Sequence, residues 1–157
     1  MRRVLLLGLG NDLLTDDAIG LRVAAAAREQ LTHHPQITVL ESTEMGLALL
    51  DLVTGFDCLV VVDAVQTGQA APGFVHELNG DDLKDLPVTS PHFLGLNDTL
   101  ALGRKLGLAV PSRVKVFAVE VQDPYTLGTN LSLALAAALP DAIERVVSAC
   151  LSFENGE

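Results

Sequence analysis

Two short, uninterrupted apolar runs constrain the fold of this chain more than any other feature of its sequence. The runs are Val4–Leu7 and Cys58–Val62; the sequence Gly8–Asn11 follows the first, and Asp63 follows the second. A strand that is covered on both faces has this pattern, because neither row of its alternating side chains meets water. The two runs therefore predict central strands of a parallel sheet that carries helices on both faces.

The rest of the sequence predicts further strands and helices around these two. Runs of β-branched or alternating residues predict strands at Ile37–Leu40, Gly73–Leu78 and Val114–Val121. The strand at Gly73–Leu78 is expected to be antiparallel or at an edge of the sheet. Apolar residues three and four positions apart predict helices at Asp17–Gln30, Gly46–Val53 and Asn97–Leu106, the last of them capped by Asn97.

Pro140 interrupts the last helical segment, Leu131–Phe153. Proline fits the first turn of a helix better than its middle, so we expect two helices that meet at this residue. The resulting order, β-α-β-α-β-β-α-β-α, predicts an α/β fold. We expect a three-layer sandwich, in which a mostly parallel, twisted five-stranded sheet has helices on both faces. With no linker or repeat in sight, residues 1–157 are expected to form a single domain.

Composition excludes several classes of partner. The 10 Lys+Arg and 20 Asp+Glu residues give a net charge of −10. This charge argues against nucleic acids and anionic membranes as partners, because both attract basic patches.

No run approaches the ~18 apolar residues of a membrane span. Asn11 and Asp12 interrupt the apolar N-terminal stretch before any signal-peptide cleavage site. The two cysteines form no C-x-x-C pair, so we expect a soluble, cytoplasmic protein.

Carboxylates follow each of the first three predicted parallel strands, where open α/β sheets bind their ligands. These residues are Asp16, Asp17, Glu41, Glu44 and Asp63, and we expect them to gather at one edge of the sheet. Asp16 and Asp17 also suit the positive end of a helix dipole, which is a purely structural interpretation. Asp63 directly follows a buried strand, and a buried acid needs a charged or metal partner.

Among the four histidines, His92 is the candidate for chemistry. It lies in the apolar, proline-containing segment Thr89–Leu96, whereas His33 and His34 are expected to be solvated and His76 to have a surface or packing role. Two carboxylates, Asp17 and Asp63, together with the imidazole of His92 make an oxygen and nitrogen donor set. Such a set suits a borderline divalent ion such as nickel or zinc, although spacing alone leaves a structural role open.

A dinucleotide site is a weaker interpretation of the first loop. Gly8-x-Gly10 after a strand is half of that fingerprint, and Glu41 lies where a ribose-binding acid is expected. However, Leu13 occupies the position of the third glycine. The adjacent Asp16 and Asp17 would also repel a pyrophosphate from the helix start.

Three groups of motifs together resemble the [NiFe]-hydrogenase maturation proteases. They are Gly8–Asn11 with Asp16–Gly20, then Val62–Ala64, then Ser90–Leu96. The resemblance implies an endopeptidase that removes a C-terminal extension from the precursor of the hydrogenase large subunit. In that family cleavage follows nickel insertion, and the protease recognises nickel that the substrate supplies, although another divalent ion could replace it in vitro.

The resemblance also assigns residues and a partner. The family's three metal-contacting positions correspond to Asp17, Asp63 and His92, and the expected partner is the large-subunit precursor, bound by a monomeric protease. Two segments depart from the family pattern: Glu41–Glu44 lacks two glycines, and Ala118–Val121 lacks a G-[IV]-x-P sequence. These departures bear on which hydrogenase is processed.

Neither a serine or cysteine catalytic arrangement nor H-E-x-x-H is visible, which leaves a metal-dependent or aspartyl-type peptidase. The metal would polarise the scissile carbonyl or lower the pKa of a bound water. Alternatively, the metal only positions the substrate, and Asp16 or Glu41 acts as the base. Two rival functions remain: a non-catalytic, nickel-dependent assembly chaperone on the same fold, and a Rossmann-type dinucleotide-binding enzyme.

Overall fold

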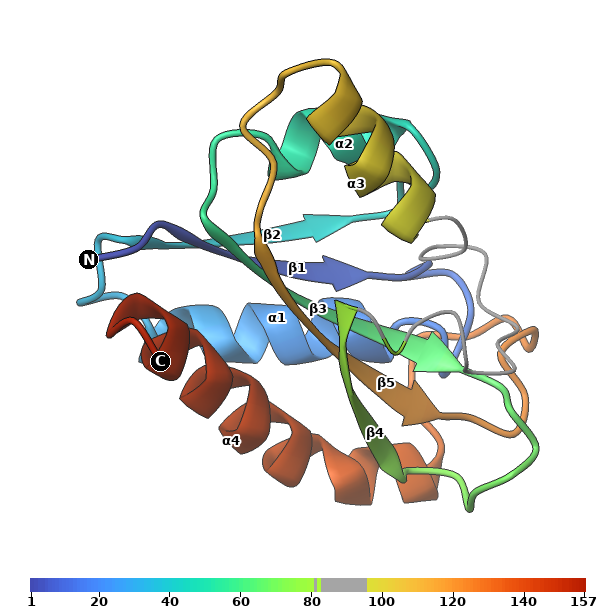
Figure 1. Cartoon of the computed structure of the whole chain (residues 1–157). Coiled ribbons are helices and arrows are strands. Elements are labelled where there is room, and N and C mark those ends of the chain that lie inside the picture. Colours follow the sequence, from blue (N-terminus) through green and yellow to red (C-terminus); the bar gives the residue numbers. More distant parts are fainter. Residues whose placement is uncertain (81, 83–95) are drawn as a thin grey trace.

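The computed structural model describes residues 1–80, 82 and 96–157, and its elements follow the predicted order (Figure 1). The elements are β1 (Val4–Leu9), α1 (Ile19–Gln30), β2 (Ile37–Ser42), α2 (Ala48–Val53), β3 (Cys58–Val65), β4 (Val75–Asn79), α3 (Leu96–Lys105), β5 (Arg113–Glu120) and α4 (Leu133–Glu154). Among the described residues, none of these helices combines the length and the apolar character needed to span a membrane.

The five strands form one sheet in the order β2-β1-β3-β5-β4. The first four strands are parallel, and β4 pairs antiparallel with β5 at the edge, as the sequence predicts. Every residue of β1 and β3 is buried, which explains the uninterrupted apolar runs in the sequence. All four parallel strands end at the same side of the molecule, the right of Figure 1.

Helices cover both faces of the sheet, which confirms the three-layer sandwich (Figure 1). Val4 and Leu6 of β1 belong to the core under α1 and α4. Leu5 and Leu7 belong to the second core, under α2 and α3. Alternate residues of one strand thus reach opposite faces, and both faces exclude water.

The prediction of two helices around Pro140 is wrong, because α4 is one helix from Leu133 to Glu154. Proline removes the N–H that would bond to the carbonyl four residues earlier, at Ala136. Both Pro140 and Ala136 are exposed, so water can take the place of the missing donor. A proline on the solvent side of a long, otherwise well-packed helix therefore does not end it.

Three helices begin elsewhere than the sequence predicts. α1 begins at Ile19, so Asp17 precedes the helix instead of starting it. α2 begins at Ala48, after Gly46, whose φ of +65° is not helical. α3 begins at Leu96, so Asn97 lies inside the first turn and is not the cap.

Candidate active site

Glycine packing places the start of α1 directly against the carboxyl ends of β1 and β3. A Cβ atom on Gly20 would lie only 2.2 Å from the Leu9 carbonyl oxygen and 2.4 Å from that of Val62. The same atom would lie 3.1 Å from the Asp63 Cα. The approach is possible only because Gly20 has no side chain, and it brings the segment that carries Asp16 and Asp17 beside Asp63.

Gly8 and Gly10 serve the same packing. A Cβ on Gly8 would lie 2.4 Å from the Gly20 carbonyl oxygen, and one on Gly10 would lie 2.2 Å from that of Asp17. The space that a pyrophosphate would need beside these glycines is filled by the helix segment itself. The Gly8-x-Gly10 sequence is thus explained by helix–strand contact without a dinucleotide.

Asp63 is completely buried within β3, two residues before the strand ends. Its Oδ1 accepts a hydrogen bond of 2.8 Å from the backbone N–H of Ala64. Asp17 is also buried, at 8% exposed. Both acids are more deeply buried than carboxylates usually are, so each side chain is held in a defined environment.

Asp16 is buried as well, but its observed contact is with the start of α4. Its Oδ1 accepts a hydrogen bond of 2.8 Å from the backbone N–H of Ser132, the N-cap residue of α4. The Ser132 hydroxyl in turn accepts from the Leu135 N–H. Asp16 therefore ties the first loop to α4, which is a structural role for one member of the adjacent pair.

Glu41 and Glu44 lie at the same edge but are exposed. The Glu41 Oε1 lies 3.1 Å from Nη1 of Arg28, in an ion pair with side chains 36% and 48% exposed. The backbone N–H of Glu44 donates to the Ser42 hydroxyl. The five acids grouped by the sequence are thus three buried aspartates and two exposed glutamates.

His92 lies outside the described residues. Within the described part of the chain, no group of three His, Cys, Asp or Glu residues could hold a metal ion. His33 is exposed, as predicted. His34 is partly solvated, with its side chain 36% exposed, and its Nδ1 lies 2.8 Å from Oε2 of the buried Glu154.

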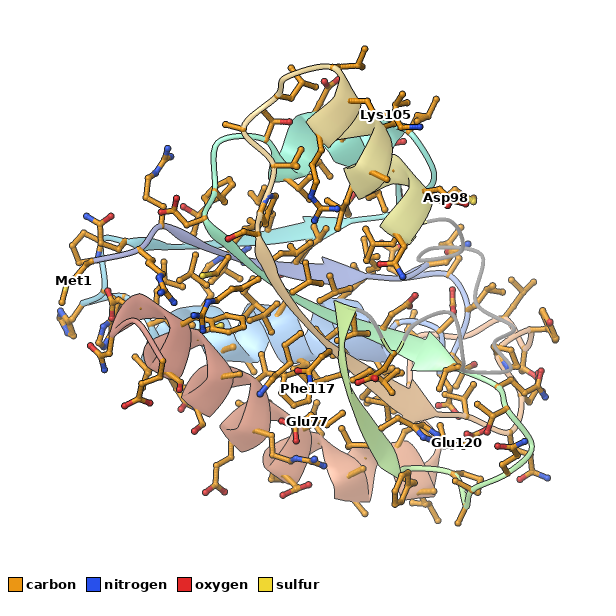
Figure 2. The ribbon with its side chains drawn as sticks, in the orientation of Figure 1. Met1, Glu77, Asp98, Lys105, Phe117 and Glu120 are labelled. Carbon is orange, nitrogen blue, oxygen red and sulfur yellow. The ribbon has the colours of Figure 1, made fainter. Side chains whose placement is uncertain are left out.

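Glu120 is a buried acid that the sequence analysis did not single out. It ends β5, next to β3, and is 1% exposed (Figure 2). Its carboxylate accepts hydrogen bonds from the N–H groups of Thr67 and Gly68 and from the Thr67 hydroxyl, and lies 2.9 Å from Nε2 of His76. The available signal was a charged residue inside an apolar strand run.

The hydrogen bonds determine the charge of Glu120. Burial acts to raise its pKa, but the bonds from Thr67, His76 and Gly68 outweigh burial and hold the pKa below its usual value. An ionised Glu120 thus holds the loop that follows β3, the strand that contains Asp63. His76, expected to have a surface or packing role, is the partner of this acid.

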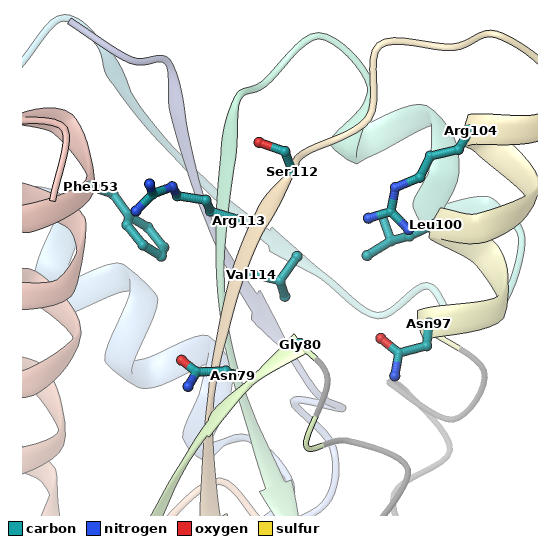
Figure 3. Close-up of a pocket in the computed structure, with 9 residues that line it drawn as sticks. All are labelled: Asn79, Gly80, Asn97, Leu100, Arg104, Ser112, Arg113, Val114 and Phe153. Carbon is teal, nitrogen blue, oxygen red and sulfur yellow. The ribbon is translucent and has the colours of Figure 1, made fainter.

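Neither cysteine is suited to be a nucleophile. Both are buried, and burial raises the pKa of Cys58 and raises that of Cys150 to about 12. A cavity of about 500 Å³ lies beside α3 and the start of β5 (Figure 3), and the described residues that line it offer no hydrolytic group. The nine residues drawn there include Arg104, Ser112 and Arg113 but no carboxylate, histidine or cysteine.

Fold and site together define an α/β protein with buried aspartates at the carboxyl edge of its sheet. The family model for hydrogenase maturation protease (HycI) matches residues 21–149. The hydrogenase 2 maturation protease of Escherichia coli K12 is 32% identical over 151 residues, which cover 94% of this chain and 90% of that protein. The chain therefore belongs to the hydrogenase maturation protease family, and it is an endopeptidase.

Solved structures agree with this assignment. The hydrogenase maturating endopeptidase HybD from E. coli superposes with a TM-score of 0.80 at 30% identity, over 96% of this chain and 93% of that one. The [NiFe] hydrogenase maturation protease HybD from Thermococcus kodakarensis gives a TM-score of 0.71 at 28% identity, over 94% and 99%. The predicted fold and the resemblance are both confirmed.

Proposed function

We propose that this endopeptidase removes a C-terminal extension from the precursor of a [NiFe]-hydrogenase large subunit after nickel has been inserted. The names of the relatives support the substrate class, since they are hydrogenase maturation proteases. The observation that carries the proposal is the contact of Gly20 with β1 and β3, which brings Asp17 and the fully buried Asp63 to one edge.

Asp17, Asp63 and His92 would contact the nickel that the precursor carries. Carboxylate oxygens and an imidazole nitrogen form a donor set that suits a borderline divalent ion. Nickel is then part of the substrate, and its removal from the precursor would remove the feature that the protease recognises. Recognition of a loaded metal would make cleavage the step that follows nickel insertion.

Water would be the nucleophile, since the sequence shows no serine or cysteine catalytic arrangement and both cysteines are buried with raised pKa values. A metal next to the scissile bond would polarise its carbonyl or lower the pKa of a bound water. The alternative bases have other contacts: Asp16 accepts from Ser132, and Glu41 pairs with Arg28. These contacts favour metal-assisted hydrolysis over a base at either residue.

The test is the mass of the precursor after incubation with the protease. Nickel-loaded precursor is expected to lose the mass of its tail, and nickel-free precursor is expected to stay intact. Asp63→Asn and His92→Ala should each slow processing at least about 100-fold, the usual scale for loss of a group that acts in the transition state. Asp51→Asn, an exposed acid on α2, is the matched control and should process normally.

Two results would contradict this proposal. Normal processing by Asp63→Asn or His92→Ala would remove the three-ligand site. A stable complex with the nickel-loaded precursor whose mass never changes would indicate a binding role in assembly without cleavage.

We further propose that the protease acts as a monomer in the cytoplasm, where [NiFe]-hydrogenase precursors would be met before assembly. The two cysteines are unpaired and buried, as in proteins of reducing compartments. Sedimentation of the purified protein at several concentrations tests the monomer, and fractionation of cells tests the compartment.

A further inference from the structure

Large exposed apolar side chains are concentrated at one edge of the sheet. Eleven are exposed among the described residues. Seven lie at or beside the carboxyl ends of the parallel strands: Leu13, Met45, Leu47, Phe74, Tyr125, Leu127 and Leu133. Single exposed apolar residues are ordinary on a protein surface, whereas a concentration of them marks a place where another molecule binds.

Contacts between their neighbours connect five of the seven, Leu13, Phe74, Tyr125, Leu127 and Leu133, which we call the apolar rim. Leu14 pairs with Leu127 in an antiparallel bridge. Asp16 bonds to Ser132, which precedes Leu133. A Cβ on Gly73 would lie 3.0 Å from the Ala134 carbonyl oxygen, so the chain next to Phe74 packs on the start of α4. The rim therefore continues from the first loop to β4.

Backbone hydrogen bonds hold part of the rim in place. The Thr15 N–H donates to the Thr126 carbonyl at 2.8 Å, and the Gly128 N–H donates to that of Leu13 at 3.1 Å. Leu13 and Leu127, on these two paired segments, are 66% and 76% exposed. Apolar side chains on a backbone that is already ordered lose less entropy on binding than those on a free loop.

The loops around the rim carry acidic residues and no basic ones. Residues 10–18, 43–47, 66–74 and 121–132 connect the strands at this edge, and they contain no Lys or Arg. The same segments carry Asp12, Asp16, Asp17, Glu44 and Asp123. Arg22 reaches the last segment from α1, where it donates to the Thr129 carbonyl. A partner that covers this surface is favoured when it brings positive charge.

We propose that the apolar rim and the acids beside it bind a segment of the hydrogenase precursor that is apolar and has cationic side chains at its margins. This inference rests on the proposed function, because it takes the precursor to be the substrate of the site with Asp17 and Asp63. The rim adjoins the edge that carries these two residues. Asp16 connects the two directly: it bonds to Ser132 at the rim and neighbours Asp17 in sequence. A segment on the rim is thereby held next to the site of cleavage.

The first test replaces two rim residues in the intact protease. Leu13→Ser/Leu127→Ser should raise KM for the nickel-loaded precursor about tenfold with kcat nearly unchanged, since lost burial weakens binding alone. The matched control is Leu106→Ser/Leu108→Ser, where the residues are 63% and 40% exposed and follow α3. Thermal unfolding verifies that both variants fold. An unchanged KM in the rim variant, or an equal rise in the control, would overturn the proposal.

The second test concerns charge. Asp12→Lys at the rim and Glu29→Lys at the far end of α1 change the net charge of the protein equally. Asp12→Lys should raise KM several-fold at low salt, and the difference should diminish in high salt because ions screen exposed charges. Equal effects of the two variants would show that net charge, and not the rim, determines binding.

The outcome separates this inference from the proposed function. If the unaltered protein does not shorten the precursor, the proposed function fails, but sedimentation of the complex still measures binding. Loss of that complex in the rim variant would support the rim, and its retention would overturn it. If the unaltered protein neither cleaves nor binds, both proposals fail. If the rim instead holds a second copy of this chain, the protein will sediment as a dimer, the rim variant as a monomer, and KM will not change.

Discussion

The two ends of the parallel strands hold their charged side chains differently. We call these ends the amino edge and the carboxyl edge of the sheet. At the amino edge, the Arg3 N–H donates to Asp57 Oδ2 at 2.8 Å, and the Arg3 guanidinium donates to the Gly55 carbonyl at 2.7 Å. His34 pairs with the buried Glu154. At the carboxyl edge, three aspartates are buried, and the described connections carry acids without Lys or Arg.

This difference separates closing the fold from binding a partner. At the amino edge, Arg3 and His34 are each matched with groups of the same chain, so these charges serve the fold. The carboxyl edge combines excess negative charge with exposed apolar side chains, which costs solubility and stability unless a partner uses them. Variants that affect one edge and leave the other intact can test this division.

Gly20→Ala should have the largest effect, a loss of about 3 kcal/mol or more in the free energy of unfolding. The added methyl would lie 2.2 Å from the Leu9 carbonyl oxygen and 2.4 Å from that of Val62, so backbone would have to move at the carboxyl edge. Urea unfolding measures the loss, and processing of the precursor should fall with it.

Gly107→Ala is the control for backbone strain. Apart from the adjoining residues, no atom of the described part of the chain lies within 4 Å of a Cβ at Gly107, so its φ of +75° is the strain that the variant tests, at about 1 kcal/mol. Equal losses in the two variants would show that close packing at Gly20 is not what joins α1 to β1 and β3.

Glu120→Gln and Glu154→Gln compare two buried acids that each contact a histidine, at opposite edges. Each should cost about 1–3 kcal/mol in the free energy of unfolding, because a buried hydrogen-bonded group loses its charge. Only Glu120→Gln should also change KM, since Glu120 holds Thr67 and Gly68 in the loop after β3. A change in KM with Glu154→Gln but not with Glu120→Gln would show that the amino edge, and not the carboxyl edge, affects substrate binding.

The contribution of Glu120 should depend on pH in a defined direction. Its pKa in the folded protein lies below the ordinary value of 4.5, so the ionised group stabilises the fold above that pH. The contribution is lost as the pH falls below 4.5 toward the folded pKa. Urea unfolding of the unaltered protein and Glu120→Gln between about pH 6 and pH 3 should show their difference shrinking toward acid. A difference that grows toward acid would contradict this sign.

The sheet could be predicted from the sequence because a strand buried on both faces has a local signature. Val4–Leu7 and Cys58–Val62 each show it without reference to the rest of the chain. Pro140 shows the limit of local rules: whether a proline ends a helix depends on which side of the helix meets water. That side is determined by packing against the sheet and not by neighbouring residues.

The candidate site and the other buried acids were predictable only in part, for a related reason. Asp63 adjoins an apolar run, so its burial follows from its own neighbours. The contact of His34 with Glu154 joins residues 120 positions apart, and no periodicity reveals it. The partners of Glu120 were hidden in the same way, because Thr67 and His76 come from a loop and an edge strand.

Asp16→Asn should have the smallest effect of these substitutions and identifies which buried aspartate at the carboxyl edge acts in hydrolysis. Asparagine keeps an oxygen that can accept from the Ser132 N–H, so the loss of stability should stay below about 1 kcal/mol. Processing should remain near normal, because Asp16 fixes the start of α4, whereas Asp17→Asn should abolish it. A folded Asp16→Asn protein that binds the precursor but does not cleave it would make Asp16 the base. The metal would then only position the substrate, and Asp17 would keep its contact with that metal.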